Sequence, residues 1–259
     1  MSLLKVSNLG KSFGGVKAVD GISFELAAGE LLALIGPNGA GKSTTFNMIN
    51  GQLRADMGSI TLDGQELFEL APREIWRLGV SRTFQIAETF LSLTVAENVQ
   101  MALLSRDRKL YSFFTRAAHY KRDEALDLLE QVRMKPQADR PCSVLAYGDV
   151  KRVEMAIAMA NSPKLLLMDE PTAGMAPKER NDLMALTKQL VTERNMAVLF
   201  TEHSMDVVFA YADRMIVLAR GRLIAGGKPR EIRDDPKVQE VYFGTGKTFE
   251  RTATLKETA

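Results

Sequence analysis

Residues 31–43 read LLALIGPNGAGKS, a run of five apolar residues followed by a glycine-rich loop. The loop matches the pattern G-x-x-x-x-G-K-[ST], which cradles the phosphates of nucleotides. A continuous apolar run is typical of a strand that is buried on both faces of a parallel sheet. The glycines let successive backbone N–H groups curl around phosphate oxygens, and the following helix presents its positive end to them. The stretch therefore predicts a strand, a phosphate-binding loop and a helix, in that order.

Two side chains of this loop carry particular chemistry. Lys42 would reach the β- and γ-phosphates of a nucleoside triphosphate, and Ser43 would ligate Mg²⁺. A plain glycine-rich turn is the alternative, and the agreement of strand, loop and helix disfavours it. A similar string, GTGKT at 244–248, has no strand before it and Val241 in place of the first glycine, so we interpret it as part of a polar tail. The residues predicted to contact the nucleotide here are Gly36, Pro37, Asn38, Gly39, Ala40, Gly41, Lys42, Ser43 and Thr44.

The composition is that of an ordinary globular protein. The chain has 259 residues, with 34 Lys and Arg against 32 Asp and Glu, so its net charge is only +2 and does not indicate a nucleic-acid partner. The single cysteine, Cys142, excludes an internal disulfide and is typical of a reducing compartment. The charged start MSLLKVSNLGKSF does not resemble a signal peptide, and no run reaches the roughly 18 apolar residues that a membrane span needs. We expect a soluble, cytoplasmic protein that contacts a membrane through a partner.

Strand and helix patterns alternate over the second half of the chain. Apolar runs such as LLLMDE (165–170) follow and precede helical patterns, which predicts a parallel sheet covered by helices. The first 80 residues read instead as short strands with turns. Residues from about 93 to 131 are helical, and Thr94 and Glu97 have the spacing of a capping box. The sequence therefore predicts an α/β core that is interrupted by a helical insertion.

Two acids end the apolar run LLLMDE. Ligands of open α/β sheets bind at the carboxyl ends of the strands, which is where these acids would lie. Asp169 suits the outer sphere of Mg²⁺, and Glu170 suits a general base that polarises an attacking water. A strand that merely ends in acids at a surface turn is the alternative, which the upstream phosphate loop disfavours.

Two further polar residues end apolar segments. His203 follows VLFTE, and a γ-phosphate contact is favoured over a structural histidine because the neighbouring strand ends in Asp169 and Glu170. Gln85 ends RTFQ, directly before the helical insertion. A glutamine that merely faces solvent would be the default interpretation at any other position.

Residues 105–122 are rich in cations and aromatic residues. The segment contains six Lys or Arg residues against one acid, Asp107, with tyrosines and phenylalanines interleaved. Such interleaving is found in nucleic-acid binding surfaces. A solvated helical hairpin with its own small apolar face is the preferred interpretation, and a surface that docks on a permease is a third.

The order of the phosphate loop, RTFQ, LAYGD, LLLMDE and TEH resembles an ABC-transporter ATPase cassette over roughly residues 3–244. The resemblance implies an α/β fold: a P-loop NTPase (RecA-like) core with an antiparallel β subdomain and an α-helical subdomain inserted at about 90–160. Residues 1–244 would form a single cassette and 245–259 a polar tail. The resemblance also implies that Phe13 stacks on the adenine of ATP, and that Gln85 contacts Mg²⁺ or water.

In this family two cassettes pair head to tail, and a signature motif of one subunit closes over the ATP held by the other. LAYGD takes the place of the commonest family signature, LSGGQ, and PTAGMAP puts Ala176 where the family usually has aspartate. The resemblance therefore implies a second ATPase subunit as a partner, in a homo- or heterodimer. The predicted signature residues, acting in trans, are Leu145, Ala146, Tyr147, Gly148 and Asp149.

LAYG, the long insertion, AGMAPKE after the acids and the string DDPKVQEVYFG resemble the ATP-binding subunit of bacterial branched-chain amino-acid importers. That resemblance implies a subunit which hydrolyses ATP with Mg²⁺ at the cytoplasmic face of the inner membrane. Integral membrane permease subunits would be its partners, and no nucleic acid would be. Related subunits energise urea import or lipopolysaccharide export, and these remain alternatives.

Three other functions are alternatives to transport. A soluble ABC-type ATPase that acts on ribosomes or DNA usually has two cassettes in one chain or a long coiled-coil insertion, and neither is found here. A P-loop kinase would not need LAYGD or His203. An inactive binding module is disfavoured by Lys42, Asp169 and Glu170.

Overall fold

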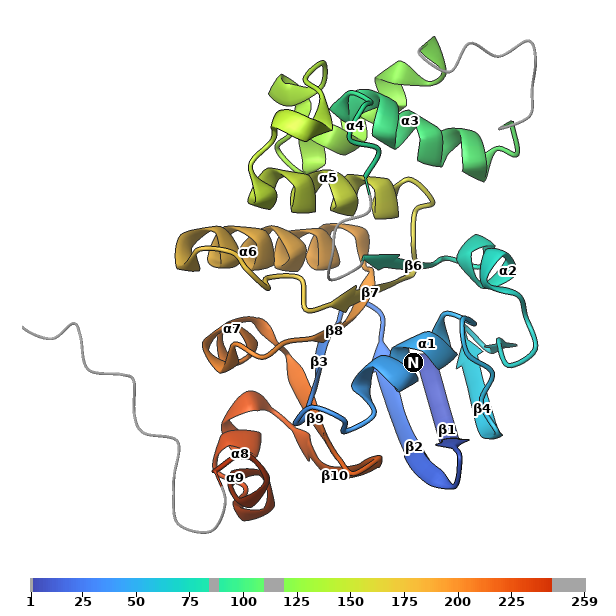
Figure 1. Cartoon of the computed structure of the whole chain (residues 1–259), viewed down its shortest axis with the longest axis vertical. Coiled ribbons are helices and arrows are strands. Elements are labelled where there is room, and N and C mark those ends of the chain that lie inside the picture. Colours follow the sequence, from blue (N-terminus) through green and yellow to red (C-terminus); the bar gives the residue numbers. More distant parts are fainter. Residues whose placement is uncertain (1, 84–88, 110–118, 244–259) are drawn as a thin grey trace, which may run out of the picture.

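The computed structural model describes residues 2–83, 89–109 and 119–243, and a six-stranded sheet forms its centre (Figure 1). The strands are β3 (Leu31–Ile35), β6 (Val80–Thr83), β7 (Leu165–Asp169), β8 (Ala197–Thr201), β9 (Arg214–Ala219) and β10 (Arg222–Gly227). They lie in the order β10-β9-β3-β8-β7-β6, and all neighbours pair in parallel except β10 with β9. The predicted parallel α/β core is confirmed.

A second sheet is antiparallel and lies beside the first helix (Figure 1). Its order is β2-β1-β4-β5, in which β1 pairs with both β2 and β4. This sheet is the antiparallel β subdomain that the family resemblance implies, although β1 and β2, with 12 residues each, are longer than the short strands expected from the sequence. The strands are β1 (Ser2–Phe13), β2 (Val16–Ala27), β4 (Met57–Leu62) and β5 (Gln65–Glu66).

Strand β3 separates two hydrophobic cores. Leu31, Ala33 and Ile35 pack in a core that extends into the helices, whereas Leu32 and Leu34 pack in a core shared with the antiparallel sheet. Alternate residues of a strand face opposite sides, so both faces of β3 are covered. This is why the run that leads into the phosphate loop is apolar without interruption.

The helices fall into two groups (Figure 1). Those of the inserted subdomain form the upper layer of Figure 1: α3 (Val95–Arg106), α4 (Arg122–Gln131) and α5 (Tyr147–Met159), with short 3₁₀ turns at Lys135–Gln137 and Cys142–Val144. The remaining helices accompany the two sheets: α1 (Lys42–Ile49), α2 (Pro72–Arg77), α6 (Pro177–Arg194), α7 (Met205–Tyr211), α8 (Pro229–Arg233) and α9 (Pro236–Phe243). Within the described residues, no helix is long and apolar enough to cross a lipid bilayer.

The capping box expected before α3 is present. The hydroxyl oxygen of Thr94 accepts a hydrogen bond from the backbone N–H of Glu97 (3.2 Å), and the Glu97 carboxylate accepts one from the backbone N–H of Thr94 (2.8 Å). The two bonds satisfy amide donors that the first turn of a helix leaves without a partner. They fix the point at which the chain enters the helical subdomain.

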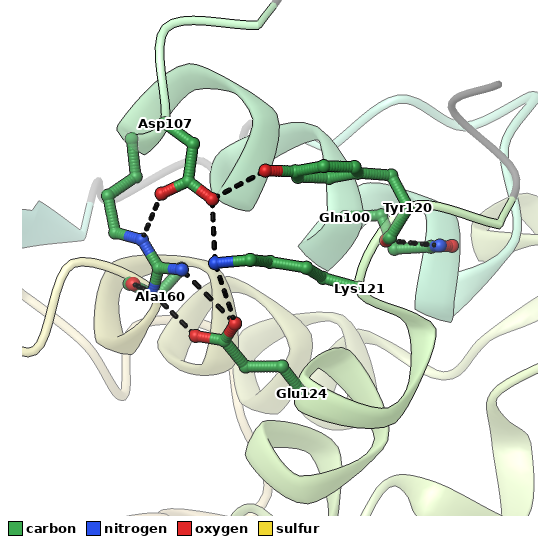
Figure 2. Close-up of polar contacts among 7 residues, drawn as sticks. Gln100, Asp107, Tyr120, Lys121, Glu124 and Ala160 are labelled. Carbon is green, nitrogen blue, oxygen red and sulfur yellow. Dashed lines mark hydrogen bonds and ion pairs between the residues drawn. The ribbon is translucent and has the colours of Figure 1, made fainter. Parts of the chain in front are cut away.

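An ion-pair network joins the end of α3 to the start of α4 (Figure 2). The carboxylate of Asp107 accepts hydrogen bonds from Arg106 (2.9 Å) and the Tyr120 hydroxyl (2.6 Å), and it pairs with Lys121 (2.7 Å). Glu124 pairs with both Arg106 and Lys121. The hydrogen bond from Arg106, followed by those from Lys121 and Tyr120, holds the pKa of Asp107 well below its ordinary range. Arg122 pairs with Asp139 (2.6 Å), so three of the described cations of the segment 105–122 are paired with acids.

The structure leaves two predictions open. The proposed boundaries of the cassette and of its helical insertion, at about 90–160, stay a prediction, although α3, α4 and α5 lie within them. The predicted polar tail 245–259 lies outside the described residues.

Candidate functional site

The phosphate loop connects β3 to α1, as its pattern predicts. Gly36 and Gly41 are required because a Cβ atom would lie closer than 3.0 Å to a backbone oxygen, that of Leu218 for Gly36 and that of Ala18 for Gly41. Gly39 differs, because a Cβ there would meet no atom of the described residues within 4 Å, although its φ of +77° is one that side chains rarely adopt. The loop is therefore packed against the protein at both ends and open at Gly39.

Lys42 folds back over this loop. Its ammonium donates hydrogen bonds to the carbonyl oxygens of Gly36 (2.7 Å) and Pro37 (3.1 Å), and the residue is only 8% exposed. Burial lowers the pKa of Lys42, while the carboxylates of Glu170 and Asp169 act in the opposite direction. The cation thus lies between the loop and the two predicted acids. Ser43, the next residue, is exposed on the first turn of α1.

Asp169 is held from both neighbouring strands. One carboxylate oxygen accepts a hydrogen bond from the hydroxyl of Thr201 at the end of β8 (2.7 Å). The other accepts one from the guanidinium of Arg82 in β6 (2.9 Å). Neither Thr201 nor Arg82 was predicted as a site residue. The parallel register, which pairs Asp169 with Thr201, brings them together, and a linear sequence does not reveal that register.

Glu170 and His203 meet directly. The Oε1 atom of Glu170 lies 2.8 Å from Nε2 of His203, although the residues are 33 positions apart. Glu170 has φ +47°, and its backbone N–H donates to the carbonyl and hydroxyl oxygens of Thr201 (both 3.1 Å). This turn directs the acid side chain out of the strand, toward the histidine. The sequence placed both residues at one edge of the sheet but did not predict their contact.

A third acid, Glu202, anchors the loop that follows β7. It is 4% exposed, and its carboxylate accepts hydrogen bonds from the backbone N–H (2.8 Å) and the hydroxyl (2.7 Å) of Thr172. Because Thr172 follows Glu170 by two residues, this contact fixes the chain immediately after the predicted base. Its position in VLFTEH, one residue before His203, was the only sequence signal.

The predicted signature residues lie at the start of α5, in the helical layer and away from α1 (Figure 1). Gly148 is buried, and a Cβ there would lie 3.4 Å from side-chain atoms of Glu179 and Met175. Tyr147 is 43% exposed. The motif is therefore a helix start, and the structure does not bring it to the phosphate loop of its own chain.

Phe13 and Gln85 complete the predicted set. Phe13 ends β1 and is half exposed, with the Lys11 ammonium 5.7 Å from the centre of its ring. A half-exposed ring has a face available for stacking. Gln85 lies outside the described residues.

The donor set at this edge fits Mg²⁺. The ion prefers oxygen ligands and keeps several of its waters. Ser43 supplies an exposed hydroxyl, and each oxygen of the Asp169 carboxylate accepts one protein hydrogen bond, which leaves a lone pair for a metal-bound water. The site can therefore place a phosphate chain, a divalent cation and a general base beside one another.

Comparison with known families agrees with this chemistry. A family model described as ABC transporter matches residues 19–173. A second, described as Branched-chain amino acid ATP-binding cassette transporter, matches residues 222–248. The first match covers the phosphate loop, the signature and the two acids, and the second covers β10 and the last helices.

Full-length relatives extend the likeness to nearly the whole chain. The chain is 39% identical to the high-affinity branched-chain amino acid transport ATP-binding protein BraF of Pseudomonas aeruginosa, over 93% of this chain and 98% of that protein. It is 40% identical to the corresponding protein LivG of Salmonella typhimurium, with the same coverage.

Solved structures share the fold. MJ1267, an ATP-binding cassette of an ABC transporter in its ADP conformation, superposes with a TM-score of 0.84 at 33% identity, covering 94% of this chain and 99% of that one. The dimeric post-hydrolysis state of the ATP-binding cassette MJ0796, bound to ADP and Pi, gives a TM-score of 0.74 at 26% identity, covering 88% and 99%.

Proposed function

This chain belongs to the ABC transporter family, and we propose that it is the ATP-hydrolysing subunit of an importer of branched-chain amino acids. The proposed ATP hydrolysis rests on the contact between Glu170 and His203, which lie 2.8 Å apart at the sheet edge that also holds Asp169. The substrate follows from the relatives, whose names state branched-chain amino acid transport.

In the proposed reaction Glu170 accepts a proton from the water that attacks the γ-phosphorus. The bond from this phosphorus to the β–γ bridging oxygen breaks, and ADP and inorganic phosphate are the products. His203 orients that carboxylate and contacts the γ-phosphate. Lys42 exchanges the loop carbonyls for β- and γ-phosphate oxygens, since its ammonium already lies within the loop. When bound, Mg²⁺ would neutralise charge on the phosphates, with Ser43 and Asp169 holding it and Gln85 assigned to it by family resemblance. Phe13 stacks on the adenine.

The signature residues serve a second subunit in this proposal. They lie at the N-terminal end of α5, where the helix dipole favours an anion. Because LAYGD lies away from the phosphate loop of its own chain, the phosphates it meets belong to a partner. The dimeric cassette among the similar structures supports such a pairing.

The other partners are integral membrane permease subunits, which would place the protein at the cytoplasmic face of the inner membrane. Urea import and lipopolysaccharide export by related systems stay as alternatives for the transported substrate. They concern the permease, since the cassette does not contact the substrate.

The test is to isolate the tagged chain from membranes, identify the permease subunits that accompany it, and reconstitute that complex in liposomes. We expect uptake of leucine, isoleucine or valine that requires enclosed ATP and is lost with Lys42→Ala. Uptake of urea instead, or of none of these compounds despite ATP hydrolysis, would contradict the assigned substrate. A complex without any permease would contradict the transport function itself.

A further inference from the structure

Arg82 bridges the two elements that carry the predicted Mg²⁺ residues. One terminal nitrogen donates to the Asp169 carboxylate (2.9 Å), and the other donates to the side-chain oxygens of Asn47 (2.6 Å) and Gln52 (3.1 Å). Asn47 lies in α1, four residues after Ser43, and residues four apart share one face of a helix. A single guanidinium thus connects Asp169 at the end of β7 to the helix face that carries Ser43.

This bridge is shielded from solvent. The side chains of Arg82 and Asp169 are 10% and 16% exposed, and the guanidinium lies 5.8 Å from the centre of the Phe46 ring. A planar guanidinium presents donors in a fixed fork, so contacts at both terminal nitrogens define its orientation. Charge-assisted bonds in such surroundings are stronger and more directional than those at the surface.

We propose that Arg82 is a positioning residue, which sets the orientation of the Asp169 carboxylate relative to Ser43 and so prepares the outer sphere of Mg²⁺. An outer-sphere carboxylate contributes only when its free lone pairs face the metal-bound waters. Thr201 fixes one oxygen and Arg82 the other, so the carboxylate cannot rotate. This role rests on the proposed ATPase function and adds a residue that acts through Asp169.

A purely electrostatic role would have the opposite consequence. Arg82 is a cation beside the Asp169 carboxylate, which is proposed to face the waters of Mg²⁺, so removing the charge of Arg82 alone would strengthen Mg²⁺ binding. Removing the contact that positions Asp169 would instead weaken Mg²⁺ binding. The sign of the change therefore separates the two roles, and Asn47 offers a second variant in which no charge changes.

The experiment measures the affinity of the full chain for a non-hydrolysable ATP analogue by calorimetry, once in EDTA and once in excess Mg²⁺. The ratio of the two dissociation constants is the gain due to Mg²⁺. We expect Arg82→Met to lower this gain at least tenfold, because a hydrogen bond to a charged group contributes about 1.5–3 kcal/mol and about 1.4 kcal/mol is tenfold. Asn47→Leu should lower it by a smaller factor. In both variants the affinity in EDTA should stay within about twofold of that of the unmodified chain. A twofold change corresponds to less free energy than the ~0.5 kcal/mol that a weak hydrogen bond contributes.

Arg54→Met is the matched control. Arg54 pairs with Glu69 at the surface, with side chains 72% and 76% exposed, so its loss should leave the gain unchanged. Should Arg82→Met fold poorly in a thermal melt, Arg82→Lys, which keeps the charge but not the fork, should show an intermediate loss.

Three outcomes would overturn the inference. An unchanged gain in Arg82→Met and Asn47→Leu would remove the positioning role, and a raised gain in Arg82→Met would assign Arg82 an electrostatic one. An equal loss of affinity in EDTA and in Mg²⁺ would make Arg82 a support of the phosphate loop. If the unmodified chain itself failed to bind the analogue, the proposed function would fail as well, and this result is distinguishable from the other three.

Discussion

Alanine substitutions at Gly39 and Gly36 should distinguish a glycine that the phosphates of the nucleotide approach from one that the fold of the loop also requires. At Gly39 an added Cβ meets no atom within 4 Å in the part of the chain that the structure describes, so the cost to the fold is the strain of φ +77°, about 1–2 kcal/mol. Since 1 kcal/mol corresponds to about 2–4 °C for chains of 150–250 residues, Gly39→Ala should lower the melting temperature by about 2–8 °C. The methyl group lies on the open side of the loop, where phosphates would approach. Nucleotide affinity should therefore fall by about tenfold or more, the equivalent of roughly 1.4 kcal/mol.

Gly36→Ala provides the contrast. Its Cβ would overlap the backbone oxygen of Leu218, so β9 or the loop must move, and overpacking of this kind typically costs about 1–3 kcal/mol in addition to backbone strain. Gly36 also accepts a hydrogen bond from Lys42, so affinity and stability should fall together. Differential scanning fluorimetry and equilibrium titration with a fluorescent ATP analogue measure the two quantities. Unchanged affinity in Gly39→Ala would refute the assignment of the open side of the loop to phosphates.

Two further predictions concern side chains. His203→Ala should lower ATP hydrolysis at least tenfold, because His203 contacts Glu170, and loss of general-base catalysis typically removes 10²–10⁴-fold. The ATP affinity of the single subunit should be unchanged, because His203 is proposed to contact only the γ-phosphate and neither the adenine nor the other phosphates; equal losses of ATP and ADP affinity in titrations would indicate a structural histidine. Asp107→Asn should lower the melting temperature at pH 7 by about 2–4 °C, if the ion-pair network contributes about 1 kcal/mol. The folded pKa of Asp107 is depressed, so its contribution is complete above the unfolded value of about 3.9 and is lost as the pH falls toward the folded value. The difference between variant and unmodified chain should accordingly shrink below about pH 4, and a constant difference across the titration would contradict the ionic origin.

Local patterns were sufficient for the elements that carry the site. The run LLALI and the acids after LLLM each define a buried strand and its end, and both are found where expected, as β3 and β7. The capping box at Thr94 likewise specifies a helix start within four residues of sequence. These features depend on neighbours along the chain, which is why sequence alone could predict them.

Contacts across the sheet could not be predicted in this way. Arg82 contacts Asp169 although the two residues are 87 positions apart, and Thr201 contacts the same carboxylate from 32 positions away. Both contacts depend on the order and register of the strands. Helix α2 was also missed, although Pro72 at its first position and a Glu74 carboxylate that accepts from the Ala71 N–H (2.8 Å) are local signals. The proline and the glutamate are typical of a helix start, so this helix could have been predicted from the sequence.

We propose that this chain hydrolyses ATP with Glu170 as the base, in sites shared by two subunits. The most direct measurement is light scattering of Glu170→Gln after size exclusion, with ATP or ADP and Mg²⁺, together with its rate of phosphate release. With ATP the mass should be twice the 28.7 kDa of one chain and with ADP it should be that of one chain. Phosphate release should fall by at least tenfold, because loss of a general base typically removes 10²–10⁴-fold. Normal turnover by Glu170→Gln would contradict the role of Glu170 as the base, and a single-chain mass with bound ATP would contradict sites shared by two subunits.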